Sequence, residues 1–399
     1  MSGVQIQAGA SRPKDRKDKI LAAAAELVAA RGFAAVGVDE IAARVGVTGP
    51  AIYRHFRTKE ELRDTLLERT VEGFTEVVEV ASHGELDQLM GAVVGHVLDH
   101  PSEAASYMRE RSGSAGGPPK HLAVAEQRFR SAWRRALHDH FAPLDPTRIA
   151  IRQQAVLEAM AMAARHPQGI ERPRLDELLT RSSMAVLLAP RIQEADVPGG
   201  GRRAWVPKGV RREQVLAAAL GLFRARGVSG TGMDEIGAAA GISGPAVYHY
   251  YPSKAELVLD AFERASERIS IATSDALLRA TSAHDALSSM VQTYVDVAMA
   301  NLDLIIVTSR EVTQLPEGER QRFDRRATEV RERFELALGE LHPDLTTAES
   351  RVLVRSVFPS LNGAAAAAGR RVGLSREIAG LGLAHLLCER SFDVVGSPA

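Results

Sequence analysis

The sequence predicts an all-α protein made of two similar halves, and three observations lead to that prediction. Alanine-rich runs and an aromatic content of only 5% favour helices over sheets. Apolar residues recur at helical spacing along much of the chain. A segment near the N-terminus also returns in the middle of the chain, so one structural module is present twice.

The repeat relates Ile20–Leu62 to Val215–Leu257, where 21 of 43 aligned positions carry the same residue. Both copies contain Arg-Gly, Asp-Glu-Ile and Gly-Pro-Ala at the same spacing. The stretch Val197–Pro207 is rich in Gly and Pro and has no helical periodicity, which is typical of a linker. We therefore expect an arm (1–13), a first head (14–60), a first helical domain (61–190), a linker (191–207), a second head (208–255) and a second helical domain (256–399).

Beyond the heads, Pro, Gly and Asp-Pro punctuate runs of helical periodicity. In the first half we expect helices over 58–80, 85–111, 121–141, 146–165 and 174–189. The second half should contain helices over 253–280, 283–301, 316–341, 347–368 and 375–392.

Within the first head the pattern predicts three short helices. Asp15–Ala30 carries an apolar stripe and ends before a glycine, and Val38–Val45 is stopped by Gly46, whose positive φ would end that helix. A third helix is expected over Thr48–Phe56, with the Thr48 hydroxyl as its N-cap and Pro50 in its first turn.

The third helix has the chemistry of a segment that enters the major groove of DNA. Its inner residues Ile52 and Phe56 should pack on the first two helices. Small residues at its tip permit close approach to the bases, and the N–H groups of a helix N-terminus favour phosphate. This leaves the following residues at the exposed tip or outer side: Thr48, Gly49, Pro50, Ala51, Tyr53, Arg54 and His55.

The segments Asp39–Ala42, Val45–Thr48 and Ile52–Leu62 resemble the DNA-binding head of TetR-family regulators. The resemblance implies that Tyr53 and His55 contact the DNA backbone, that Thr48–Ala51 and Arg54 face bases, and that Lys59 holds a phosphate. Basic arms precede both heads and include Lys17 and Arg212. The matching positions of the second head are Ser243, Gly244, Pro245, Ala246, Tyr248, His249, Tyr250 and Lys254.

Two positions depart from the family pattern. Before its second helix the family commonly has a Thr-Thr or Thr-Ser pair, which caps the helix beside a phosphate, whereas the heads here have Val36-Gly37 and Thr231-Gly232. The second head also has Pro252 where the first has Arg57, so one phosphate contact is expected to be missing there.

Composition and motifs weigh against other classes of protein. The formal net charge is zero, so DNA binding requires a local positive face. Cys388 is the only cysteine and reads as a buried apolar residue, which excludes a disulfide framework and fits the cytoplasm. His96 and His100 share a helical face without an evident third ligand, so no metal or cofactor is expected. No phosphate loop, nucleophile elbow, catalytic motif or membrane segment was recognised.

The family resemblance implies that the helical domains form an effector pocket. Its occupant would be a small, apolar molecule. Aromatic and Met residues at helical spacing are also typical of an ordinary core. The candidate lining residues are Tyr107, Met108, Phe129, Trp133, Met160 and Met162 in the first half, and Tyr294, Phe323, Phe334, Phe358 and Asn362 in the second.

TetR-family proteins resemble homodimers joined by their last two helices, which implies that 146–165 and 174–189 pair with 347–368 and 375–392 inside this chain. The small residues Ala364–Gly369 would permit close approach of these helices. We expect a single-chain pseudo-dimer, open to higher homo-oligomers, that represses from an asymmetric operator until an effector releases it. The tandem arrangement is similar to actinobacterial regulators of mce-type lipid and sterol uptake operons.

Two rival hypotheses remain open at this point. In the first, only one head binds DNA and the other serves dimerisation or partner binding in a sensor. Helix-turn-helix geometry also occurs in proteins that never touch DNA, which keeps this alternative open. In the second, the all-α scaffold carries an enzyme, which would require a clustered acid/base or metal constellation in the folded core.

Overall fold

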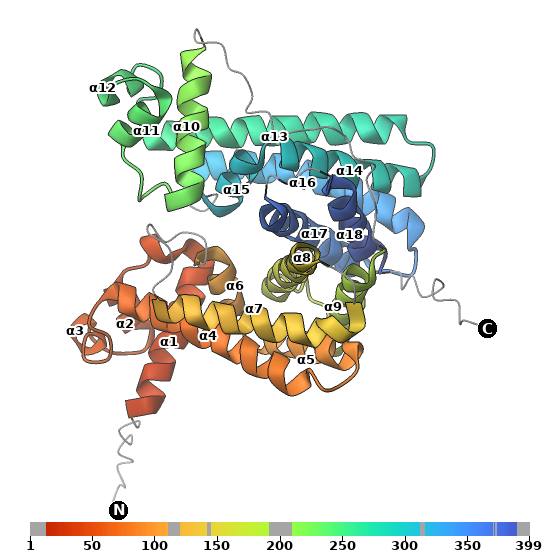
Figure 1. The fold of residues 1–399 in the computed structure, drawn as a ribbon, viewed down its shortest axis with the longest axis horizontal. Helices are drawn as coiled ribbons and strands as arrows, with labels where there is room; N and C mark the ends of the chain where they lie inside the picture. The colour runs from red at the N-terminus through yellow and green to blue at the C-terminus, as the bar shows by residue number, and fades with distance from the viewer. Residues whose placement is uncertain are drawn as a thin grey trace, which may run out of the picture.

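The computed structural model describes residues 13–110, 120–141, 145–190, 210–311, 316–369, 371 and 373–388. Every regular element within these ranges is a helix, which confirms the predicted all-α fold (Figure 1). The expected linker and nearly all of the expected N-terminal arm lie outside the described residues.

In the first half the helices are α1 (Pro13–Arg31), the 3₁₀ turn η1 (Phe33–Ala35), α2 (Val38–Arg44), α3 (Gly49–Ile52), α4 (Lys59–Ala81), α5 (Leu86–Asp99), α6 (Pro101–Glu110), α7 (Lys120–Phe141), α8 (Pro146–Arg165) and α9 (Arg172–Leu188). The second half contains α10 (Arg211–Arg226), α11 (Met233–Ala240), α12 (Gly244–Val247), α13 (Lys254–Arg279), α14 (Ala283–Ala300), α15 (Leu302–Glu311), α16 (Glu317–Leu341), α17 (Thr347–Ala368) and α18 (Ser375–Leu387).

Two expected helices differ from those observed, and one observed helix was not expected. The helix expected over 85–111 is broken into α5 and α6, because Pro101 has no N–H and forces His100 out of helical backbone geometry. The helix α15 was not expected. It is separated from α14 at Asn301, whose side-chain amide donates to the carbonyl of Val297 (2.8 Å) and competes with the helix. The last helix ends at Leu387 rather than at 392, and the buried Cys388 follows it with φ of 51°.

The first head has its own apolar core, whereas the apolar residues of the second head belong to the large core that it shares with the helical domains. In the first head Ile20, Ile41, Ile52 and Phe56 are all buried, which confirms the inward direction expected for Ile52 and Phe56. The same positions in the second head hold Val215, Ile236, Val247 and Tyr251, and these are buried too.

A short helix of each helical domain packs against the first helix of its head: α6 against α1 in the first half, and α15 against α10 in the second. Glu110 at the end of α6 accepts a hydrogen bond from the backbone N–H of Phe33 (2.8 Å), and Ser106 donates to the carbonyl of Ala25 (2.8 Å). In the second half, Arg224 of α10 pairs with Asp303 of α15 (2.6 Å). The helices α6 and α15 are therefore equivalent supports for the two heads.

The two halves meet through four helices, α8, α9, α17 and α18, in the middle of the molecule (Figure 1). The closest approach is between α8 and α17. A Cβ at Gly363 would lie 2.7 Å from Cγ of Glu158 and 3.0 Å from Cγ of Gln154, so only glycine leaves room for α8 there. Ala364, Ala365 and Ala368 of the same stretch are buried, and Ala365 packs with Leu302 and Ile306 of α15.

A buried charge cluster lies where α8 meets α18. Glu377 of α18 is fully buried and pairs with Arg148 and with Arg152, the latter at 2.6 Å. Arg152 also donates to the carbonyl of Ala189 (2.9 Å). Burial, together with the charge of Arg148, lowers the pKa of Arg152 to about 10, so its guanidinium remains charged at neutral pH.

Within the described ranges, no single helix is both long and apolar enough to cross a bilayer. The helices α14 and α15 meet the length and composition criteria only as a pair, and they are bent by 100° relative to each other.

The buried His385 makes the stability of the second half depend on pH. Its Nε2 lies 2.9 Å from Oγ of Ser356, and burial lowers its pKa from 6.5 to about 4. The unfolded chain binds a proton at this histidine between pH 6.5 and 4 while the folded chain does not, so stability is lost as the pH falls through this window. We predict a loss of about 3 kcal/mol in the free energy of unfolding.

Urea unfolding between pH 7 and 4 checks this prediction by comparing the wild type with His385→Leu. The variant should have a shallower pH dependence by about 3 kcal/mol. The matched control is His83→Leu, because His83 is exposed and should leave the slope unchanged. Equal slopes for wild type and His385→Leu would contradict the assignment.

Candidate nucleic-acid interface

The tight turn between the second and third helices is the same in both heads. Gly46 has φ of 70° and so does Gly241, which confirms the positive φ expected for the glycine that stops the second helix. Because a side chain is strained in this conformation, the turn requires glycine. It sets the third helix across the first two in each head.

The expected hydroxyl cap of the third helix is wrong for Thr48, and Ser243 at the equivalent position makes no cap either. Thr48 and Ser243 occupy the N-cap position in extended backbone, but neither side chain makes a capping hydrogen bond. Proline follows two positions later and has no N–H to donate. The next N–H, that of Ala51, already donates to the backbone carbonyl of Thr48 (2.9 Å). The hydroxyls of Thr48 and Ser243 therefore stay at an exposed position on the tip of each head.

The third helix is also shorter than the expected 48–56. Regular α-helix ends at Ile52, and the chain tightens as His55 donates its backbone N–H to the carbonyl of Ile52 (2.9 Å). Tyr53 and Arg54 consequently lie on a turn that follows the helix, where both side chains are exposed.

Gly49 and Gly244 are buried, contrary to the expected exposure at the tip. A Cβ at Gly49 would lie 1.9 Å from Oδ1 of Asp39, and one at Gly244 would lie 1.6 Å from Oδ1 of Asp234. Each glycine thus lets the third helix sit against the aspartate of the second. Their role in the head is one of packing.

The structure divides the predicted contact residues into two groups. Ala51, His55, Ala246 and Tyr250 are half-buried. The exposed ones form what we call the reading set of each head: Thr48, Pro50, Tyr53 and Arg54 in the first, and Ser243, Pro245, Tyr248 and His249 in the second. Tyr53 and Tyr248 are 51% and 53% exposed, unusual for large aromatic side chains and matched between the heads.

The lysines at the start of the fourth helix of each head hold the turn after the first helix. Lys59 Nζ donates to the carbonyl of Phe33 (2.9 Å) and lies 4.4 Å from the centre of that ring. Lys254 Nζ donates to the carbonyls of Val228 (2.8 Å) and Thr231 (2.9 Å). Both lysines therefore have a structural task, and phosphate binding by them stays a prediction.

Lys17 and Arg212 lie near equivalent aromatic residues just after the third helix of each head, Phe56 in the first head and Tyr251 in the second. Lys17 Nζ is 5.2 Å from the centre of the Phe56 ring. Arg212 stacks 4.3 Å from the Tyr251 ring, donates to the carbonyl of Tyr250 (3.1 Å) and pairs with Asp260 (3.3 Å). Arg212 is thus more firmly engaged than Lys17.

At the first departure from the family pattern, the residue two positions before the second helix is buried in both heads. Val36 packs in the core of the first head, and the Thr231 hydroxyl donates to the carbonyl of Gly227 (2.9 Å) instead of capping the helix. In the second head, Glu235 accepts the backbone N–H of Gly232 (2.8 Å). Pro252 and Arg57 are both exposed.

Sequence reasoning missed two ion pairs that are repeated in both heads. Arg69 pairs with Asp18 (2.5 Å), and at the equivalent positions Arg264 pairs with Glu213 (2.6 Å). Arg31 pairs with Glu40, and Arg226 pairs with Glu235 (2.7 Å). The recurrence of opposite charges at repeated positions is the signal that could have revealed them.

The predicted effector residues lie inside the two helical domains. Tyr107, Phe129, Trp133, Met160, Tyr294 and Phe334 are buried, whereas Met108, Met162, Phe323, Phe358 and Asn362 are half-buried. In the second half the structure brings four of them together, because the rings of Phe334 and Phe358 are 5.1 Å apart. The Tyr294 hydroxyl donates to Asn362 (2.8 Å), and the rings of Tyr294 and Phe358 are 5.0 Å apart.

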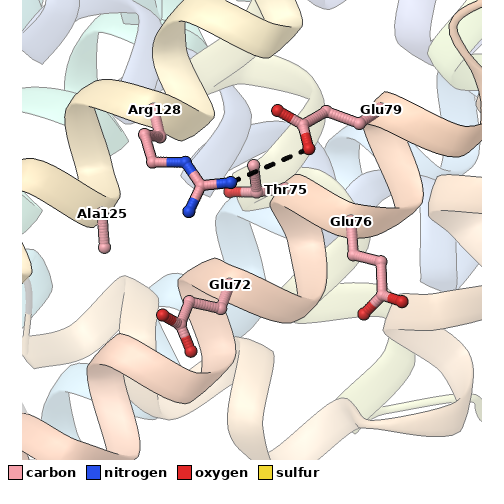
Figure 2. A pocket seen from close by; sticks show the side chains of 6 residues that line it. All are labelled: Glu72, Thr75, Glu76, Glu79, Ala125 and Arg128. Atoms are coloured by element: carbon pink, nitrogen blue, oxygen red, sulfur yellow. Dashed lines mark ion pairs between the residues drawn. The ribbon is translucent and has the colours of Figure 1, made fainter.

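A hollow of about 280 Å³ lies elsewhere, between α4 and α7 (Figure 2). It is lined by Glu72, Thr75, Glu76, Glu79, Ala125 and Arg128, so it contains none of the predicted effector residues. Arg128 reaches toward Glu79 across it, at 3.9 Å. Its charged walls do not suit an apolar molecule.

A known protein family matches this chain twice, once in each copy of the internal repeat. The model of the family "Bacterial regulatory proteins, tetR family" matches residues 20–66 and again residues 215–261. The chain is 36% identical over 109 residues to the HTH-type transcriptional activator FasR of Mycolicibacterium smegmatis, a match that covers 27% of this chain and 50% of FasR. It is 32% identical over 120 residues to the HTH-type transcriptional regulator CymR of Pseudomonas putida, covering 28% of this chain and 59% of CymR. These matches span only about half to three-fifths of the relatives' length.

Among solved structures, the ketosteroid transcriptional regulator KstR2 of Mycobacterium tuberculosis matches with 19% identity and a TM-score of 0.40. The match covers 46% of this chain and 95% of KstR2.

Gly49 and Gly244, the buried glycines that begin the third helix of each head, lead to a prediction that differs between the two heads. Gly49→Ala should be tolerated, because only the side chain of the exposed Asp39 obstructs the new methyl group and it can rotate. Gly244→Ala places the methyl group 3.0 Å from Cα of Asp234, which cannot rotate away. We expect it to cost about 1–3 kcal/mol of stability. Thermal unfolding of both full-length variants measures this, and equal losses would contradict it.

Proposed function

This chain belongs to the TetR family of bacterial regulatory proteins, and from that premise we propose that it binds a single operator as a single-chain pseudo-dimer. The relatives matched over 109 and 120 residues are transcription regulators, which supports DNA binding and regulation. We propose that both heads contact DNA, that the chain has no enzymatic activity, and that it acts in the cytoplasm.

The observation that carries the proposal is the matched reading set on each head. Tyr53 and Tyr248 stand exposed at equivalent positions, each followed by a basic or titratable side chain, Arg54 or His249. Both heads lie at the same end of the molecule, on the left of Figure 1. Two surfaces of this kind on one side suit successive major grooves of one duplex.

The two heads should recognise different half-sites. Arg54 of the first head is replaced by His249 in the second, and Arg57 by Pro252. An arginine side chain can bind guanine O6 and N7 with two hydrogen bonds, which a histidine ring cannot reproduce. A symmetric homodimer presents the same residues twice, whereas this chain does not. We therefore propose an asymmetric operator.

We propose that a small apolar effector, lipid- or sterol-related, controls release from DNA. Tyr294 and Phe358 are apolar neighbours of Asn362, whose amide donates to Ser309 of α15 (3.1 Å). Since α15 holds the second head through the Asp303–Arg224 pair, a molecule inserted among these side chains would shift that support. An effector that prefers the shifted state lowers operator affinity by population shift.

We propose repression as the output, because a duplex covered by two heads is closed to RNA polymerase where it overlaps a promoter. Reporter transcription with and without the chain measures the direction of control.

Operator binding should depend on both reading sets. We expect two double variants to weaken operator binding: Tyr53→Ala with Arg54→Ala, and Tyr248→Ala with His249→Ala. Each should cost about 1–3 kcal/mol of binding free energy per lost base contact. Each should also reduce the slope of log K against log salt concentration by about one per lost phosphate contact. The control is Arg135→Ala, which removes an exposed positive charge beside Glu79, away from the heads. Salt-titrated fluorescence anisotropy measures both quantities. Loss confined to the first pair would instead favour a sensor with one DNA-binding head.

The operator should be asymmetric in sequence and in mutational sensitivity. Selection of bound fragments from genomic DNA, followed by footprinting with each base substituted, reads both. We expect the half-site contacted by Arg54 to tolerate fewer substitutions at one G·C pair than the other half-site. A perfect palindrome with equal sensitivity in both halves would refute the asymmetric operator.

A further inference from the structure

Four charged residues occupy equivalent positions in the four helices that join the halves. Each is the third residue of its helix. In the first half these residues are both arginine, Arg148 in α8 and Arg174 in α9. In the second half they are both glutamate, Glu349 in α17 and Glu377 in α18. At these positions the first half therefore carries two positive charges and the second half two negative charges.

The four residues form two equivalent contacts across the interface. Arg148 pairs with Glu377, and Arg174 pairs with Glu349. The carboxylates are almost completely buried, with side-chain exposures of 0% for Glu377 and 4% for Glu349. Because these charges are shielded from water, their partners matter far more than those of exposed pairs.

The arginines stand where a helix by itself disfavours them. The N-terminal turn of a helix carries partial positive charge, which stabilises carboxylates and opposes cations. Glu349 exploits this by accepting the backbone N–H of Thr346 (2.7 Å) in a capping box. Arg148 pairs locally with Asp145 (3.1 Å) and Arg174 with Glu177 (3.0 Å), and each arginine also pairs with the buried carboxylate opposite it.

Packing supports the same pairing through shape. Gly363 of α17 leaves space for Gln154 and Glu158 of α8. When α8 and α17 are aligned on their N-caps, Met162 is the residue of α8 equivalent to Gly363. Two first halves facing each other would therefore press methionine against the side chains that glycine now accommodates.

We propose that this interface is a specificity device by which each first half accepts a second half and rejects its own kind. Pairing two first halves would set arginine against arginine, and pairing two second halves would set glutamate against glutamate. Like charges in such contacts strongly disfavour the wrong partner. The inference rests on the proposed pseudo-dimer, and it explains how this chain avoids the like-with-like dimer.

The test uses the full chain with a protease site introduced between residues 191 and 207, cut after folding. Native mass spectrometry without DNA then reports which halves remain together, so the result is independent of operator binding. The cut wild type should contain only pairs of one first half with one second half. Pairs of two first halves or of two second halves would overturn the proposal.

Charge exchange at one contact tests the cause. Arg174→Glu alone and Glu349→Arg alone should each weaken the association of the cut halves by roughly tenfold or more, because like charges then face each other. The double variant inverts the pair and should recover most of that loss. Recovery also shows that the single variants did not merely misfold. A double variant no tighter than the single ones would overturn the proposal.

The matched control is Arg172→Glu, two residues away on the same helix. Arg172 pairs with Asp99 inside its own half (2.9 Å). Its reversal should leave the association of the cut halves unchanged. A loss as large as that of Arg174→Glu would mean that any charge reversal on α9 suffices, and would also overturn the proposal.

Discussion

The contact between α8 and α17 is the constraint on which the rest of the structure depends. Both helices are largely buried, and apolar side chains such as Ala155 and Met160 in α8 and Val354 and Ala364 in α17 are removed from water. Gly363 sets how closely the two helices approach. In the first half α5, α6, α7 and α9 pack against α8, and in the second half α14, α15, α16 and α18 pack against α17. Both heads lie at one end of the molecule (Figure 1).

Each head is connected to this central contact by a short helix. Glu110 of α6 holds the backbone of the first head, and Asp303 of α15 holds Arg224 of the second. The supports differ in chemistry: one is a carboxylate on a backbone N–H and the other is an ion pair. The two heads can therefore respond differently to the same change in the helical domains, which matches the difference between their reading sets.

Local patterns predicted much of this molecule. The repeat located both heads, the glycine rule predicted the positive φ of Gly46, and the bounds 347–368 and 146–165 agree with α17 and α8. The misses have tertiary or competing local causes. Gly49 is buried because Asp39 of another helix covers it, which no local pattern reveals. The Thr48 cap fails because proline removes one donor and a backbone carbonyl takes the next. Effector residues depend on packing between distant helices, and the sequence could name only candidates.

We propose above all that one chain with two unlike heads occupies one operator. Native mass spectrometry of the full chain on a duplex carrying a selected site tests it most directly, with hydroxyl-radical footprinting of the same complex. The account predicts one chain per duplex and protection of two neighbouring major grooves. Two chains per duplex, each protecting a single groove through its first head, would contradict it.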